Sequence, residues 1–453
     1  LLYASITKSA GVWVHARRGN VDWKVVGWLA AGSIPAALLC VVLLRVLGIQ
    51  TEKVSGIITA SLGVALILTA AAMPIAFATW SALLNNFVFE VAGFSGVEIG
   101  WLHTVREIPG LLAVAVIGLL LVFREQMLGL SMLVLLGLAT AVTAWFPSLG
   151  GILTLTLLSS IGFHYFETVN QSLQLQWIEK GRAPQMLGWI VGAASGASLL
   201  IYAAIVFLWE PLGLTYDVVY MVSGGLCVAI ALFCMIAYPQ FEGPHEQHRH
   251  IVLRRRYWLY YALQFMSGAR RQIFVVFAGF MMVERFGMKV SEMTALLLVN
   301  YVLQMFAAPA MGRALGKWGE RNVMIFEYVG LTLVFLAYGG LYWFGWGLVI
   351  AGALYIADQM FFALSFALRT YFQKIADPAD IAPTAAVAFT INHIAAVFLP
   401  ALLGYMWAKS PDHVFVLGAG MALVALFLAL LIPRHPEPGH ETVLGGARAA
   451  PAE

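Results

Sequence analysis

Long apolar stretches recur along the whole chain and decide what it can fold into. A helix that crosses a bilayer needs about 20 mostly apolar residues, and the sequence holds about fourteen such segments. Only 11% of the residues are charged, against about 25% in soluble domains. The sequence therefore predicts an all-α polytopic membrane protein. The expected segments are 23–47 and 54–72, then twelve at 74–92, 108–123, 127–146, 150–173, 186–208, 216–238, 257–283, 292–312, 323–343, 347–370, 383–407 and 413–432.

The last twelve segments divide into two groups of six. The one long polar loop, 239–256, separates an expected N-terminal half, 73–238, from a C-terminal half, 257–432. A short internal repeat supports this division, because "GFSGVEIG" at 93–100 resembles "GMKVSEMT" at 287–294. Six-plus-six repeats are a known transporter architecture. The tail at 433–453, rich in Pro, Gly and Ala, is predicted to be disordered.

The basic residues predict how the chain is oriented. If residue 74 starts in the cytoplasm, most loop arginines and lysines fall on that side, and basic residues favour the cytoplasmic face. The central loop and the C-terminus are then cytoplasmic. Within this loop Arg254, Arg255 and Arg256 are predicted to contact anionic lipid, and Asp380 is predicted to cap the helix that follows it.

The twelve-segment unit resembles the major facilitator superfamily. The resemblance lies in "GRALGKWGER" at 312–321, where the family has a cytoplasmic gate loop. Four residues match the family pattern there, while Gly316 replaces an acid and Glu320 replaces a base; in the first half only Gly118 survives. The resemblance implies transport by alternating access in a bacterial inner membrane. The matching residues are Gly312, Lys317, Gly319 and Arg321.

Residues 1–72 resemble part of a different family, the sulfite exporters of TauE/SafE type. "GVWVHARRGNVDWKVVGWLAAGSIPAALL" at 11–39 carries a basic loop and an Asp-Trp helix start, with Arg17, Arg18, Asp22 and Trp23 in the matching positions. Only part of that family's first repeat is present, so we expect a truncated or fused segment that ends near Ala71–Pro74.

Two adjacent arginines, Arg270 and Arg271, lie within an apolar segment. Charges at that depth are costly and usually mark function. Neighbouring helix residues point about 100° apart, so both cannot face one spot. We expect one arginine to bind an anionic substrate and the other to form an internal ion pair.

A polar stripe is predicted on the segment 150–173, with His164, Glu167, Asn170, Gln171 and Gln174 recurring every three to four residues. Such a stripe must face protein or water. Glu167 is our first choice of proton carrier and His164 the second, because a buried carboxyl group can titrate near neutral pH. The alternative is a structural hydrogen-bond network.

Other polar residues within apolar segments are further candidates. Asp358 is expected to be a counter-ion of one of the two arginines or a second proton site, and His393 is grouped with it. Arg106 and Glu107 are expected to form a surface pair of little energetic value. The remaining candidates for contact with substrate are Asn85, Asn86, Asn170, Gln171, Asn300, Gln304 and Asn392.

Together these features predict a secondary active transporter for a small anionic or zwitterionic solute, coupled to protons. No enzyme, cofactor, metal or nucleic-acid motif stands out in the sequence. Two alternatives stay open. One is a membrane sensor or scaffold that does not transport, because the gate loop is altered. The other is an exporter of sulfur oxyanions, because of residues 1–72.

Overall fold

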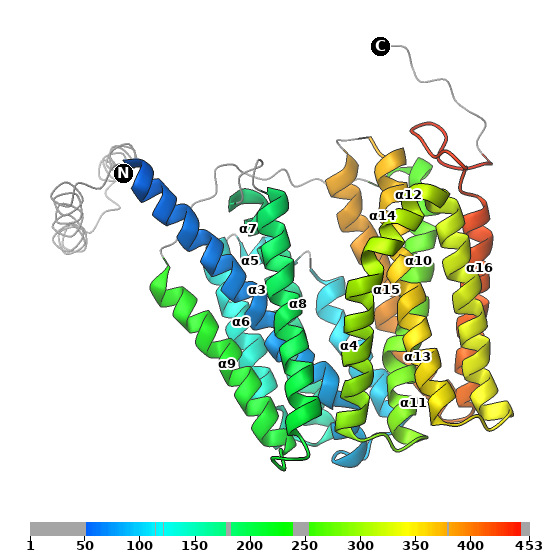
Figure 1. Cartoon of the computed structure of the whole chain (residues 1–453), viewed down its shortest axis with the longest axis horizontal. Helices are drawn as coiled ribbons and strands as arrows, with labels where there is room; N and C mark the ends of the chain where they lie inside the picture. The colour runs from blue at the N-terminus through cyan, green and yellow to red at the C-terminus, as the bar shows by residue number, and fades with distance from the viewer. Residues whose placement is uncertain are drawn as a thin grey trace. The chain divides into compact units, whose positions relative to one another are not determined.

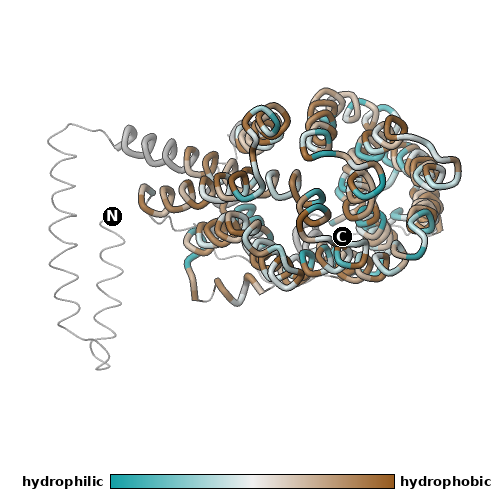
Figure 2. The backbone as a smooth tube through the Cα atoms, turned by 90° about the horizontal axis from the view of Figure 1, so that it is seen from below, coloured by the Kyte–Doolittle hydropathy of each residue, from teal (hydrophilic) through white to brown (hydrophobic). Residues whose placement is uncertain are grey.

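The structure is a computed structural model that describes residues 51–113, 115–120, 122–177, 183–238, 253–377 and 380–444 (Figure 1). The chain divides into two compact units, Leu1–Gly63 and Val64–Glu453. Ten stretches of the described residues are helical, long and apolar enough to cross a membrane. The predicted all-α membrane fold is therefore confirmed, and apolar residues dominate most helices in Figure 2.

Helices of the N-terminal half run from α3 to α9. Their bounds are α3 Thr51–Glu90, α4 Gly96–Leu111, α5 Ala115–Leu119, α6 Glu125–Val142, the short η1 Thr143–Trp145, α7 Leu149–Trp177, α8 Ala183–Leu208 and α9 Tyr216–Ala237.

Helices of the C-terminal half follow the central loop. Their bounds are η2 Arg255–Tyr257, α10 Trp258–Gln272, the π-helix η3 Ile273–Ala278, α11 Gly279–Glu284, α12 Val290–Trp343, α13 Leu348–Phe362, η4 Ala363–Ser365, α14 Phe366–Ile375, α15 Ile381–Trp407 and α16 Pro411–Leu430. Within α12 the backbone turns at Gly319, whose φ of 74° is left-handed. The two apolar stretches of this helix are Val290–Ala308 and Ala310–Trp343, and this gate-loop residue lies in the second.

The short repeat predicted from sequence is also a repeat of structure. Gly93 and Gly287 both adopt left-handed φ angles, 66° and 63°, which favour glycine. Glu98 then accepts a hydrogen bond from the Ser95 backbone N–H, and Glu292 accepts one from the Lys289 backbone N–H, each at 2.9 Å. The same capping bond therefore starts α4 and α12 at equivalent places in the two halves.

The boundary of the transporter unit differs from the prediction. Helix α3 passes through Ala71–Pro74 without a break, so the expected seam lies inside a helix. Leu66 and Ala70 pack with Ile190 of α8, and Ala72 packs in a cluster with Leu130 of α6. Residues 64–72 therefore belong to the transporter unit. Most of the predicted exporter-like segment, residues 1–50, lies outside the described residues.

Small residues join α4 of the first half to α15 of the second. A methyl group added at Gly100 would lie 2.4 Å from the Pro400 carbonyl oxygen, and one added at Gly404 would lie 2.5 Å from the carbonyl oxygen of Gly96. The Thr104 hydroxyl donates to the Val397 carbonyl oxygen at 2.8 Å. Close approach of small residues is how helices associate in lipid. We call the end of the bundle where α4 begins the closed end.

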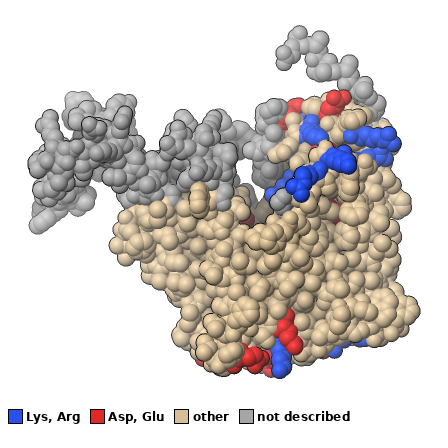
Figure 3. Space-filling model, in the orientation of Figure 1, with Lys and Arg blue, Asp and Glu red and all other residues tan. Residues whose placement is uncertain are grey.

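Basic side chains gather at the other end, the basic end, which Figure 3 shows at the top. Two of the three arginines predicted to contact lipid also form ion pairs, because Arg254 donates to Asp380 at 2.9 Å and Arg256 pairs with Asp377. Their contact with lipid stays a prediction. Asp380 does occupy the N-cap position of α15, but its side chain makes no capping bond. It accepts instead from Arg254 and Tyr257.

Part of the predicted disordered tail is ordered. The Val443 backbone N–H donates to the Leu431 carbonyl oxygen at 2.9 Å, and the Tyr371 hydroxyl donates to the Glu441 carbonyl oxygen at 2.6 Å. The chain between Pro433 and Leu444 therefore folds back on α14 and α16 at the basic end.

Candidate functional site between the two halves

Arg270 forms an internal ion pair. Its guanidinium Nη2 lies 3.4 Å from Glu327 Oε1, and both side chains are buried, at 1% and 0% exposure. The Phe362 ring lies beneath the guanidinium, with 5.6 Å between Arg270 Cζ and the ring centroid. The internal ion pair expected for one of the two arginines is therefore seen at Arg270. Our reading of the sequence missed Glu327, although it is the single carboxylate in the apolar run 323–343.

Arg271 contacts α15 instead of α12. It is half-buried, and its Nη2 donates to Asn392 Oδ1 of α15 at 3.4 Å. The Asn392 amide in turn donates to the Gln264 carbonyl oxygen, also at 3.4 Å. Among the described residues, no carboxylate lies within ion-pair distance of Arg271. The π-helix η3 begins two residues later, and such helical irregularities are frequent at functional sites.

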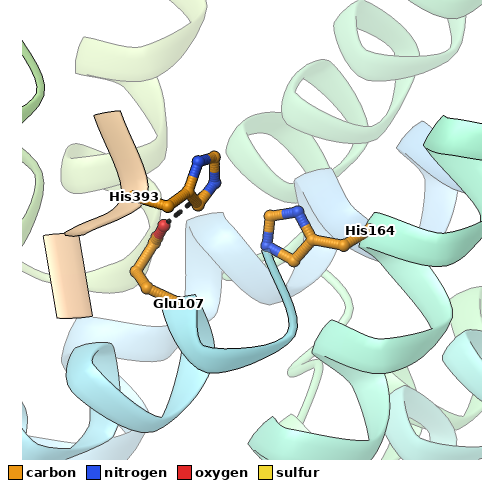
Figure 4. A group of neighbouring side chains, drawn as sticks. All are labelled: Glu107, His164 and His393. Atoms are coloured by element: carbon orange, nitrogen blue, oxygen red, sulfur yellow. Dashed lines mark ion pairs between the residues drawn. The ribbon is translucent and has the colours of Figure 1, made fainter. Parts of the chain in front are cut away.

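A second polar cluster lies next to Arg271 and spans both halves (Figure 4). Glu107 of α4 lies between His393 of α15 and His164 of α7. The distance from Glu107 Oε2 to His393 Nε2 is 3.5 Å, and the two imidazole centroids are 5.4 Å apart. Gly110 leaves room for both rings, since a methyl group there would lie 2.3 Å from His393 Cδ2. The cluster is therefore assembled only when α4 and α15 are in contact.

The expected surface pair of Arg106 and Glu107 is corrected by this geometry. The pair exists, with 3.0 Å between Arg106 Nη2 and Glu107 Oε1, but the Glu107 side chain is only 1% exposed. The sequence misled us because the segment expected there began at residue 108, whereas α4 runs from Gly96 to Leu111 and holds Glu107 within it. Neither α4 nor the run from α10 to α11 is among the ten apolar spans, and these two segments carry the charged residues of the site.

The hydrogen bond of His393 defines what the cluster can bind. Its Nδ1 lies 2.9 Å from the Phe389 carbonyl oxygen, which can only accept, so Nδ1 carries a proton. In a neutral ring the lone pair of Nε2 then faces the Glu107 carboxylate. Two facing lone pairs repel unless a cation lies between them, so this geometry is suited to a proton or a metal ion.

The three side chains also meet the distance criterion of a metal site, because one ligand atom from each lies within 4.8 Å of the others. The surrounding charge opposes a divalent ion. Arg106 contacts Glu107 directly, and Arg271 is an electrostatic neighbour of the same carboxylate. A proton adds less positive charge than a metal ion in this setting and is the better candidate.

The other predicted residues are dispersed. Asn86 joins the halves near the closed end by donating to the Met288 carbonyl oxygen at 2.7 Å, and the Asn85 amide packs against Gly279. Glu167 is half-buried and accepts from Gln171 at 3.4 Å. Asp358 and Asn300 are buried in the C-terminal half, whereas Asn170 and Gln304 are half-buried. The structure therefore brings together Arg271, Asn392, His393 and His164 of the predicted set, with Glu107 as an addition.

Comparisons with known proteins agree with this architecture. The profile of the Major Facilitator Superfamily matches residues 68–400. A mutant of the nucleoside transporter NupG superposes with a TM-score of 0.68 at 14% identity, covering 81% of this chain and 98% of that chain. A D-xylose-proton symporter superposes with a TM-score of 0.61 at 13% identity, covering 82% and 98%.

A bacterial homolog of the human lysosomal transporter Spinster, inward-facing and occupied, gives a TM-score of 0.62 at 12% identity, covering 87% and 99%. At these identities the likeness shows the fold alone. No curated protein matches the sequence. No family match supports the exporter resemblance of residues 1–72.

Proposed function

The chain belongs to the major facilitator superfamily, and from this premise we propose that it carries a small anionic or zwitterionic solute whose negative group binds Arg271. Membership of a transporter family and the transporter structural neighbours indicate a secondary transporter rather than an enzyme. The observation that carries the finer proposal is a half-buried guanidinium between the halves, with only amide and carbonyl groups within hydrogen-bond reach among the described residues.

The missing ion pair of Arg271 supports a negative solute. Arg106 is paired with Glu107, and Arg369, near Glu167, is exposed. Among the described residues no carboxylate lies within ion-pair distance of Arg271. An anionic group would supply this partner, since guanidinium binds carboxylate and phosphate through two parallel hydrogen bonds. Asn392 lies beside it as a further polar contact for the solute.

Proton coupling is the second part of the proposal. The pair of Glu107 and His393 joins the two halves and needs a cation between its facing lone pairs. Alternating access separates α4 from α15, and the two groups would then exchange this shared proton with water. His164 lies within reach as the next acceptor. Glu167, our first choice of proton carrier from the sequence, lies in electrostatic range of Arg271.

Orientation follows from the distribution of basic residues. The basic end carries Arg254, Arg255, Arg256, Arg321 and Lys374, and basic residues favour the cytoplasm. We therefore assign this end to the cytoplasmic face of a bacterial inner membrane. The tight contact of α4 and α15 then closes the outer side, which corresponds to an inward-facing state.

A thermal-shift panel on purified protein tests the proposal. Carboxylates, phosphate and sulfate would be compared with neutral sugars and amines. A ligand at about 100 times its dissociation constant adds about 2.7 kcal/mol to the free energy of unfolding. We expect a rise in melting temperature with particular anions that disappears in Arg271→Gln and persists in Lys409→Gln, an exposed matched control. A rise that survives in Arg271→Gln would contradict the assignment of this residue.

One observation keeps the sensor or scaffold function in view. In the gate loop, Glu320 replaces a base and pairs with Lys374 at 2.8 Å. This ion pair ties α12 to α14 within one half. Anion binding without anion flux in proteoliposomes would favour a sensor.

A further inference from the structure

A group of three charged side chains lies inside the C-terminal half, on helices that do not take part in the contact of α4 with α15. Arg270 comes from α10, Glu327 from α12 and Asp358 from α13, and each is at most 1% exposed. Glu327 holds the ion-pair contact with Arg270, and Asp358 is an electrostatic neighbour of both. Two buried carboxylates therefore lie in electrostatic range of one guanidinium, and only Glu327 contacts it.

The hydrogen bonds leave this group incomplete. Glu327 Oε2, Asp358 Oδ2 and Arg270 Nε are buried and have no hydrogen-bond partner among the described residues. The other titratable groups in electrostatic range on the packed helices are phenols, which bring no positive charge: Tyr328, Tyr338 and Tyr355. Arg271, the remaining cation close to Arg270, faces Asn392 instead.

One arginine neutralises one buried carboxylate, and a second ionised carboxylate in a medium of low dielectric constant is strongly disfavoured. The extra charge is removed when a carboxylate oxygen takes a proton from water and becomes a hydroxyl. A proton needs no coordination shell, so it suits a packed interior. We propose that Glu327 and Asp358 form a proton-binding site around Arg270, distinct from the pair of Glu107 and His393.

This inference rests on the proposed transport function and adds a coupling site to it. Arg270 and Arg271 are consecutive residues of α10, so the solute group and the proton site act on the same helical turn. A shift of this turn when a solute binds Arg271 would move Arg270 relative to its two carboxylates. The proton affinity of the group would change with the occupancy of the solute site.

Infrared spectroscopy of the full-length protein in proteoliposomes tests the site with the proton itself as probe. We expect the wild type at neutral pH to show the C=O band of a protonated buried carboxyl group, one per molecule. Glu327→Gln and Asp358→Asn should each remove this band, because the remaining carboxylate pairs with Arg270 and stays ionised. Glu284→Gln, which changes a half-buried acid bonded to Trp407 in the same half, should leave it in place.

The outcomes separate this inference from the proposed function. A band absent from the wild type, or one that persists in both variants, overturns the proton site whatever the transport assays show. If only one variant folds, its spectrum alone decides. Loss of the band in the variants supports the site, even if the anion panel and flux assays with Arg271→Gln contradict the proposed solute.

Discussion

Arg270 and Arg271 show how one residue step changes the role of a side chain in a packed helix. Arg270 turns into the C-terminal half and meets Glu327, whereas Arg271 turns toward Asn392 of α15. The two directions follow from the rotation of about 100° per residue.

This difference predicts unequal effects on stability. Arg270→Gln leaves a buried carboxylate without its cation, and breaking such a pair typically costs about 3–5 kcal/mol. Arg271→Gln removes no ion pair among the described residues, so we expect a much smaller loss. Melting temperatures in detergent without ligand would measure both. Equal losses in the two variants would contradict the roles assigned to them.

Asp380 gives a prediction for pH. Its hydrogen bonds from the Arg254 guanidinium hold the pKa of this carboxyl below its usual range, and Tyr257 acts in the same direction. Because the pKa is lower in the folded state, the stabilisation is fully present above the ordinary pKa of about 3.9 and is lost as the pH falls through the folded value.

Asp380→Asn should therefore lower the melting temperature at neutral pH and reduce its fall under acid conditions. Melting curves between about pH 6 and pH 3 would show this as a shallower slope than in the wild type. Glu437→Gln, at an exposed carboxyl, should leave the slope unchanged. If the melting temperature of Asp380→Asn fell with pH as steeply as that of the wild type, the Asp380 carboxylate would not be the source of this pH dependence.

At the residue scale, the structure brings together several polar groups that stand out within apolar runs of the sequence. Arg271 contacts Asn392, and His164 lies beside His393; their roles stay predictions. Glu107 was misjudged because the segment expected from sequence began at residue 108, so a carboxylate inside α4 was placed at a helix end near the surface. That Arg270 pairs with Glu327 could not be read from sequence, since it depends on the packing of α10 against α12.

At the scale of helices, local signals were enough to predict the repeat. Gly93 and Glu98, with Gly287 and Glu292, act within one turn of their own helices, so the printed sequence contains all that is needed. Contacts between distant segments were not predictable. The bond of Tyr371 to the Glu441 carbonyl oxygen joins residues 70 positions apart.

The α4–α15 contact makes a testable prediction at this scale. Gly100→Leu would place a side chain against the Pro400 carbonyl oxygen, where even a methyl group is 2.4 Å away, so the closed end cannot form as it stands. We expect the population to shift toward a state that is open at this end. Val91 follows α3 in the first half, Lys409 follows α15 in the second half, and both are exposed. The distance between spin labels at these two positions should increase.

Gly420→Leu is the matched control for this change, because no atom of the described residues lies within 4 Å of a methyl group added there. Its spin-label distances should equal those of the wild type. If Gly100→Leu also left the distances unchanged, α4 and α15 would not be the contact that closes this end.

At the scale of the whole molecule, the boundary of the transporter unit is the main difference between sequence and structure. The sequence placed it near Met73, where one family resemblance gives way to another and almost no polar linker is present. The packing of Leu66, Ala70 and Ala72 against α8 and α6 moves it to Val64, inside a continuous helix. A boundary inside a helix leaves no mark in composition, so contacts were needed to find it.

Two truncations distinguish the boundaries. A protein that lacks residues 1–63 should keep the melting temperature and anion response of the full chain, because the unit Val64–Glu453 retains its internal contacts. A protein that lacks residues 1–72 should melt at a lower temperature, because Ile190 and Leu130 lose their packing partners on α3. Within the membrane this loss comes from van der Waals contact rather than from water exclusion. If both truncated proteins melted like the full chain, residues 64–72 would be dispensable and the boundary expected from sequence would be restored.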